Sequence, residues 1–237
     1  MALNKVYGLS ILLPLVVTVA SCSQPSPPEP IELPIPAVGI VELDATILEP
    51  EQYQLLDIGV KVFDVSISEE EILELNEWIF TEIRENETHY LPYVLRSTLV
   101  ASNQWGPVRV LPLEDPSMDL LISATVLASD GHRLTMHVEA RDSTGRLWID
   151  KDYADQSFAD DFPASTRYTP GNQFDSANFT EPFQDVYDQV NNDLVDMRST
   201  LSTEDLVDIK QISQLVYAGD LAPESFAKTW AEMNLVD

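Results

Sequence analysis

The chain has 237 residues, and its 40 acidic and 13 basic residues give a formal net charge of −27. This charge argues against binding to nucleic acid, which needs a basic footprint, and against adsorption to anionic lipid headgroups. Because Cys22 is the only cysteine, the chain cannot form an internal disulfide.

The first 21 residues have the pattern of a secretory signal peptide. Lys5 is the only charge in the first 28 residues, and an apolar run from Leu9 to Ala20 follows it. A membrane span takes roughly 20 apolar residues, so this run is too short to cross a bilayer. A basic start, a short apolar core and small residues before a cleavage site indicate a signal peptide.

The residues around the cysteine make this prediction more specific. The sequence VASC, Val19 to Cys22, resembles a bacterial lipobox. The resemblance implies cleavage before Cys22 and attachment of a diacylglyceryl group to its thiol, with a further acyl chain such as palmitate on its amine. Ser23 is not the aspartate linked to inner-membrane retention, which implies an outer-membrane protein that faces the periplasm. The alternative is an ordinary signal peptide with an incidental cysteine.

Residues 22–51 are predicted to form a tether. Seven prolines fall between Pro25 and Pro50, without a helical period. A proline-rich linker is extended, at about 3.1 Å per residue. The segment would therefore hold the folded part away from the membrane. A disordered N-terminus with no set length is the alternative.

Residues 52–153 are predicted to form an α+β domain that begins with a strand and two helices. Ile58, Val60 and Val62 fall on one face of the strand. The first helix begins at Ser68, which forms a capping box with a glutamate three residues later. The second runs from about residue 90 to 102, with Pro92 in its first turn.

Four more strands are predicted after these helices. A turn and short strand come from WGPVRVLP, and DLLISATVLA predicts a strand buried on both faces. Asp130 and Gly131 predict a tight hairpin turn into a strand with strict alternation. DSTG predicts the next turn, and RLWIDKDY the last strand. On one face of the alternating strand lie Leu134, Met136, Val138 and Ala140, and on the other Arg133, Thr135, His137, Glu139 and Arg141.

This order resembles the periplasmic α/β fold shared by curli-secretion lipoproteins, the amino-terminal domain of TolB and penicillin-binding-protein activator lipoproteins. The resemblance rests on the helix before SNQWGPVRV, on DLLISATV, and on the hairpin that closes in DSTGRLWIDKDY. It implies a role in envelope assembly or scaffolding without catalysis. The apparent second helix and the long C-terminal part depart from the pattern and leave the particular family open.

Two further segments follow the domain. Residues 154–180 form a long loop with little periodicity, which is either a partner-binding arm or a segment that buries its own aromatic rings. Residues 181–237 are predicted to form a C-terminal three-helix extension, with helices that begin near Thr180, Glu204 and Pro223. The candidate partner-binding residues of the loop are Phe158, Phe162, Tyr168, Phe174 and Phe179.

No pattern in the chain indicates catalysis, a cofactor or a metal. His132 and His137 are five residues apart on one strand, so they face opposite sides, and His137 with Glu139 lacks a third ligand. The acids between Asp150 and Asp161 lack the order of a calcium loop. We therefore expect a non-catalytic, lipid-anchored envelope protein that acts in the assembly, scaffolding or regulation of a cell-envelope complex, with an envelope protein as its partner. The alternative is a periplasmic binding module for a glycan or lipid, and an unrecognised hydrolase is a third possibility.

Overall fold

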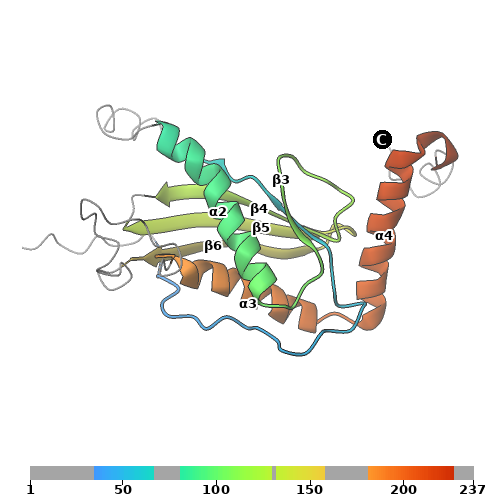
Figure 1. Cartoon of the computed structure of the whole chain (residues 1–237), viewed down its shortest axis with the longest axis horizontal. Helices are drawn as coiled ribbons and strands as arrows, with labels where there is room; N and C mark the ends of the chain where they lie inside the picture. The colour runs from blue at the N-terminus through green and yellow to red at the C-terminus, as the bar shows by residue number, and fades with distance from the viewer. Residues whose placement is uncertain (1–34, 67–80, 130–131, 158–180, 227–237) are drawn as a thin grey trace, which may run out of the picture. The chain divides into compact units, whose positions relative to one another are not determined.

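A mixed β-sheet forms the centre of the computed structural model, which describes residues 35–66, 81–129, 132–157 and 181–226 (Figure 1). All of these residues belong to a single unit of the chain. Within them the sheet has six strands in the order β3-β1-β4-β5-β6, and the short β2 pairs with β4. This architecture confirms the predicted α+β class. The strands are β1 (Ile58–Lys61), β2 (Asp64–Val65), β3 (Val108–Leu111), β4 (Leu120–Ser129), β5 (Arg133–Asp142) and β6 (Leu147–Gln156).

The sheet combines a parallel half with an antiparallel half. β1 lies between β3 and β4 and runs parallel to both. β4, β5 and β6 form an antiparallel meander, as the two predicted hairpins require. The turn residues 130–131 lie outside the described residues. Gly145 closes the second turn with φ +85°, a conformation that glycine adopts without steric cost.

The alternation predicted for β5 is confirmed. Leu134, Met136, Val138 and Ala140 are fully buried, whereas His137 on the opposite face is half-exposed. The prediction for β4 was wrong in one respect, because only its Ile122 face is fully buried. The opposite face is half-buried, because the described helices that pack across the sheet, Thr81–Ala101 and Gln184–Ser199, lie on the Ile122 side.

Helix α2 (Thr81–Ala101) corrects the predicted start of the second helix. The residues between 84 and 89 are helical, and Pro92 lies inside the helix rather than in its first turn. Proline has no N–H to bond the carbonyl four residues earlier. That carbonyl belongs to Thr88, and it accepts a hydrogen bond from the backbone N–H of Phe63 at 3.1 Å. The tertiary bond compensates for the missing helical one. The predicted helix from Ser68 falls mainly on residues 67–80, outside the described part.

Helix α3 (Gln184–Ser199) packs beside α2 and against β6, so it belongs to the same core (Figure 1). Leu91, Leu95 and Leu99 of α2 face this core, as their spacing predicted. Helix α4 (Thr203–Leu221) follows after a short turn and lies at one end of the sheet rather than across its face (Figure 1). The third predicted C-terminal helix falls mainly on residues 227–237, outside the described part. No helix among the described residues is long and apolar enough to span a membrane.

Residues 38–46 lie along α3 and are called the strap. The N–H of Val41 donates to Asp185 at 2.8 Å. Asn192 accepts from the N–H of Asp44 at 2.8 Å and donates to the carbonyl of Glu42 at 2.9 Å. These side chains bind the backbone of the strap, much as a neighbouring strand would. The second part of the predicted tether is therefore attached to the domain.

Both outer strands of the sheet have a covered carbonyl. On β6, the carbonyl of Ala154 accepts a hydrogen bond from the N–H of Val38 in the strap, at 2.8 Å. On β3, the carbonyl of Val108 accepts from the side chain of Arg96 at 3.2 Å. Free edge strands invite pairing with other chains, so both contacts reduce that tendency.

Candidate functional site

A cavity of about 520 Å³ lies between α4 and the ends of β1, β3 and β4. Its wall comes from three segments: Asp57 before β1, residues 109–119 of β3 and the following loop, and residues 210–217 of α4. Ligand pockets are usually between roughly 300 and 1,000 Å³ in volume, so this cavity has the size of a small-molecule site.

The deep wall of the cavity is a closed polar network around Asp119, whose side chain is buried. One carboxylate oxygen accepts from Lys210 at 3.1 Å and from the N–H of Asp57 at 2.8 Å. The other accepts a short hydrogen bond from Ser213. Lys210 also donates to the carbonyl of Leu55 at 2.6 Å. The buried charges of this network are therefore matched within the protein.

This network does not have the geometry of a nucleophilic serine. The hydroxyl of Ser213 is buried, and its neighbours Asp119 and the carbonyl of Lys210 are both acceptors. A nucleophilic serine needs a base that removes its proton and space for a substrate beside the oxygen. Ser213 lines the cavity, but its hydroxyl donates to Asp119, a weakly basic carboxylate that also accepts from Lys210 and Asp57, so we read the group as the structural link between α4 and the sheet.

The mouth of the cavity holds a looser pair. A nitrogen of Arg109 lies 3.7 Å from a carboxylate oxygen of Asp57, and both side chains are partly exposed. Among the described residues, the other contact of Arg109 is with the sulfur of Met118 at 3.8 Å. Burial raises the pKa of Asp57, and the negative Asp119 raises it further, against the opposing effects of Lys210 and Arg109.

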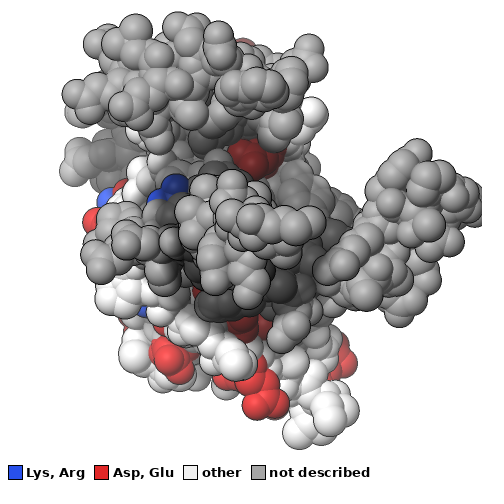
Figure 2. Space-filling model, turned by 90° about the vertical axis from the view of Figure 1, so that its left-hand side faces the viewer, with Lys and Arg blue, Asp and Glu red and all other residues white. Residues whose placement is uncertain are grey.

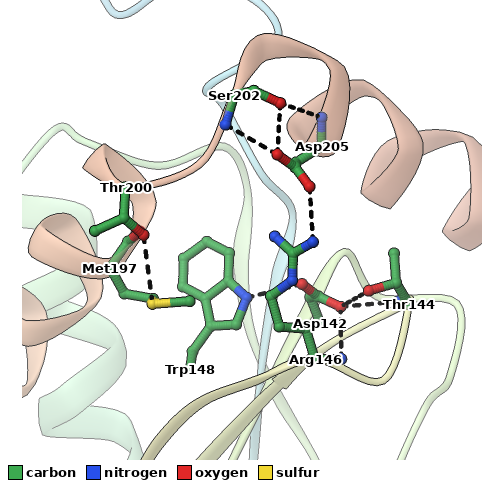
Figure 3. A network of polar contacts seen from close by, with 8 residues as sticks. All are labelled: Asp142, Thr144, Arg146, Trp148, Met197, Thr200, Ser202 and Asp205. Carbon is green, nitrogen blue, oxygen red and sulfur yellow. Dashed lines mark hydrogen bonds and ion pairs between the residues drawn. The ribbon is translucent and has the colours of Figure 1, made fainter.

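The first turn of α4 attaches the helix that forms one wall of the cavity (Figure 3). Ser202 caps the helix: its hydroxyl accepts from the N–H of Asp205, whose carboxylate accepts from the N–H of Ser202 in return. Arg146, just before β6, donates to the same carboxylate at 2.7 Å. The hydrogen bonds from Ser202 and Arg146 lower the pKa of Asp205 to about 2.

Asp142 holds the hairpin turn that carries Arg146 (Figure 3). One of its carboxylate oxygens accepts from the N–H groups of Thr144 and Arg146, at 2.9 and 3.1 Å. The other accepts from the indole N–H of Trp148 at 2.8 Å. The turn predicted from DSTG thus positions the contact that attaches α4.

His137 contacts residues of the neighbouring strand rather than Glu139, which lies beside it on the same face of β5. Its two ring nitrogens lie 2.7 Å from Asp152 and 3.2 Å from Asp150, both on the neighbouring strand β6. Glu139 instead accepts from Arg141 at 2.7 Å. Among the described residues no three His, Cys, Asp or Glu side chains are grouped so that they could hold a metal ion.

The predicted site residues lie outside the described part of the chain, so their roles stay predictions. They are Cys22, Phe158, Phe162, Tyr168, Phe174 and Phe179. Sequence reasoning did not predict the cavity residues. Asp57, Arg109 and Lys210 are each separated by at least fifty positions and form no motif.

Acidic side chains are numerous on the surface as well as in the composition. On the face drawn in Figure 2, the described atoms include several acidic side chains and few basic ones. This distribution fits the net charge of −27.

Comparisons with known proteins give no family. No family model and no curated protein matches the chain. Among solved structures, a Xanthomonas campestris protein of family DUF330 is 10% identical and covers 71% of this chain and 95% of its own, with a TM-score of 0.35. The PelC dodecamer subunit from Paraburkholderia phytofirmans is 12% identical and covers 62% of this chain and 93% of its own, with a TM-score of 0.37. A homolog of the neuraminyllactose-binding hemagglutinin from Helicobacter pylori is 10% identical and covers 73% of this chain and 98% of its own, with a TM-score of 0.24. Likenesses of this size do not transfer a function to this chain.

Proposed function

We propose that this chain is a non-catalytic lipoprotein, anchored through Cys22 in the outer membrane, that docks on or helps to assemble a larger complex of the cell envelope. The lipobox-like VASC sequence supports the anchor, and the resemblance to assembly lipoproteins supports the role. In this proposal α3, α4 and a third helix from about Pro223 form the C-terminal helical part.

The structural observation that best supports the docking role is the exposure of apolar side chains on α4. Buried residues of this helix include Leu206 and Ile209 near its start. Towards its end, Tyr217 and Leu221 are 56% and 69% exposed. These two side chains lie four positions apart on one face of the helix, and adjoining exposed apolar side chains mark interaction surfaces more often than single ones do. We therefore place the partner contact on the second half of α4.

Crosslinking in intact cells tests the docking role. A photo-reactive amino acid at position 221 should capture a defined envelope protein, identified by mass spectrometry. The same amino acid at position 93, where Tyr93 of α2 is 58% exposed, is the matched control. Equal capture from both positions, or none from position 221, would contradict docking through α4.

Fractionation tests the anchor separately. Cys22→Ala should leave an unprocessed or soluble protein, whereas the wild type should sediment with outer membranes and incorporate labelled palmitate. If the variant sediments with membranes as fully as the wild type, the lipid anchor at Cys22 is wrong.

The cavity beside α4 favours a second candidate function, a binding module for an envelope ligand. Its volume of about 520 Å³ and its partly free polar groups at the mouth support this function. The two functions share Tyr217, which lines the cavity, whereas Leu221 lies one helical turn beyond the cavity-lining residues.

A further inference from the structure

The cavity offers a ligand two kinds of group. Its deep wall is closed, because Lys210, Asp119 and Ser213 bind one another. Its mouth keeps free hydrogen-bonding capacity, because Asp57 and Arg109 are 3.7 Å apart, longer than a good hydrogen bond. A guanidinium that donates and a carboxylate that accepts therefore lie side by side. This arrangement suits a hydroxyl group, which accepts and donates at once.

Helix α4 adds an aromatic ring and an amide to the same mouth. Gln214 and Tyr217 line the cavity, both are exposed, and neither side chain has a polar contact with the described residues. A tyrosine ring presents an apolar face next to its polar tip. The mouth thus combines a flat apolar surface with donors and acceptors on one side.

The surroundings disfavour other ligands. An anionic ligand would face three carboxylates in the cavity and only two cations, Arg109 and Lys210. The carboxylates are those of Asp57, Asp115 and Asp119, and the whole chain has a net charge of −27. A metal finds no suitable group of ligands among the described residues. A lipid tail finds few apolar groups, since Leu111 and Met118 are the aliphatic side chains of the wall. A peptide that added a strand beside β3 would need the carbonyl of Val108 as a hydrogen-bond acceptor, and the side chain of Arg96 already donates to it.

We propose that this cavity binds a neutral glycan, with one sugar ring against Tyr217 and its hydroxyl groups shared between Asp57 and Arg109. A sugar ring has an apolar C–H face and a polar edge, which match the ring and the charged pair. The inference rests on the second proposed function, because it names the ligand class of that site.

Saturation-transfer NMR on the detergent-solubilised full chain tests the inference. The detergent is an amine oxide, because a sugar-based detergent would compete for the site. The probes are neutral tetrasaccharides of glucose and of N-acetylglucosamine, a sulfated tetrasaccharide, tetra-alanine and a short-chain phosphatidylcholine. We expect a signal from the ring protons of at least one neutral tetrasaccharide and weaker signals from the other probes.

Variants locate the binding. Tyr217→Ala and Arg109→Ala should each weaken binding of the neutral tetrasaccharide by about tenfold, because each loses one principal contact. Matched controls are Tyr93→Ala on α2 and Arg141→Ala on β5, both exposed, which should leave binding unchanged. Circular dichroism and thermal unfolding confirm that each variant is folded.

The outcomes separate the inference from the proposed function. Neutral-glycan binding that Tyr217→Ala leaves intact overturns the inference. Preferred binding of the sulfated sugar, the peptide or the phosphatidylcholine through Arg109 overturns the glycan assignment but retains a binding function. The absence of binding by any probe contradicts both, without affecting the crosslinking and fractionation tests of the docking lipoprotein.

Discussion

The guanidinium of Arg198 lies over the ring of Trp105, with its central carbon 4.4 Å from the ring centroid. Arg198 is buried, and it donates to the side-chain oxygen of Gln104 at 2.7 Å and to the backbone carbonyl of Gln54 at 3.2 Å. The indole N–H of Trp105 in turn donates to Asn191 at 3.0 Å. Burial lowers the pKa of Arg198, but an arginine remains charged at neutral pH. One cation thus joins α3 to the segments before β1 and β3.

Removal of this cation should weaken the whole domain. Arg198→Ala leaves a cavity and deprives the oxygens of Gln54 and Gln104 of their donor. We expect the free energy of unfolding to fall by roughly 3 kcal/mol. Urea denaturation measures this change. Arg141→Ala, which removes an exposed arginine, should change it by less than about 0.5 kcal/mol. Equal effects of the two substitutions would show that the Arg198 contacts contribute little.

The capping box of α4 should make this helix sensitive to acid. The pKa of Asp205 is about 2 in the folded chain, below its value of about 4 when unfolded. A lowered pKa gives stability that is complete above about pH 4 and is lost as the pH falls through about 2. The protection factors of the amides in the first turn of α4, which correct for the pH dependence of intrinsic exchange, should therefore fall over this range. An unchanged protection pattern down to pH 2 would contradict the role of Asp205.

Loss of the cap itself should be visible at neutral pH. Ser202→Ala should destabilise the start of α4 by about 1 kcal/mol, the usual cost of losing an N-cap. Faster amide exchange in residues 203–206 measures it. Thr203→Ala, at the next exposed position, is the control and should leave exchange nearly unchanged.

Two buried tyrosines should respond in opposite ways to loss of the hydroxyl. The hydroxyl of Tyr187 has no hydrogen-bond partner among the described residues, whereas that of Tyr153 donates to Asp193 at 2.6 Å. Tyr187→Phe should leave the free energy of unfolding unchanged or raise it by up to about 1 kcal/mol, because an unsatisfied polar group is removed. Tyr153→Phe should lower it by about 1.5 kcal/mol. Destabilisation by Tyr187→Phe would indicate a partner, such as a buried water.

Asn192 should control the attachment of the strap. Asn192→Ala removes the two hydrogen bonds to Glu42 and Asp44, so exchange of the Asp44 amide should accelerate by about tenfold. Proteolysis within residues 38–46 should accelerate with it. Asp196→Ala, an exposed change on α3, is the control. If both variants keep wild-type exchange, other contacts hold the strap.

Local patterns predicted much of the sheet. The alternation around Met136 identified the buried face of β5, because each side chain of a strand follows its neighbour to the opposite side. The prediction that a helix begins at about residue 90, with Pro92 in its first turn, was wrong. The helix continues through Pro92 because the N–H of Phe63, distant in sequence, satisfies the carbonyl of Thr88. Sequence alone carries no signal for such a tertiary bond.

The candidate cavity could not be predicted for a similar reason. Asp57, Arg109 and Lys210 come together only when β1 and β3 pair and α4 docks on their ends. The partners of His137 depend on the register of β5 and β6, which places it opposite Asp152. Spacing along the strand places Glu139 near His137 on the same face but does not indicate the two aspartates. Composition and short motifs do not encode such pairings.

The strap has a mechanical consequence if the chain is anchored through Cys22 as proposed. A pull through the residues that precede it reaches Val38 first, then Val41, and then Asp44 and its bonds to α3. The load therefore acts on one bond at a time instead of on all together, and we expect the strap to peel away at a lower force than the sheet resists. Release of residues 38–46 would lengthen the tether by up to roughly 30 Å while the core stays folded. Single-molecule pulling from residue 22 should show this extension as a separate step, earlier in Asn192→Ala than in the wild type.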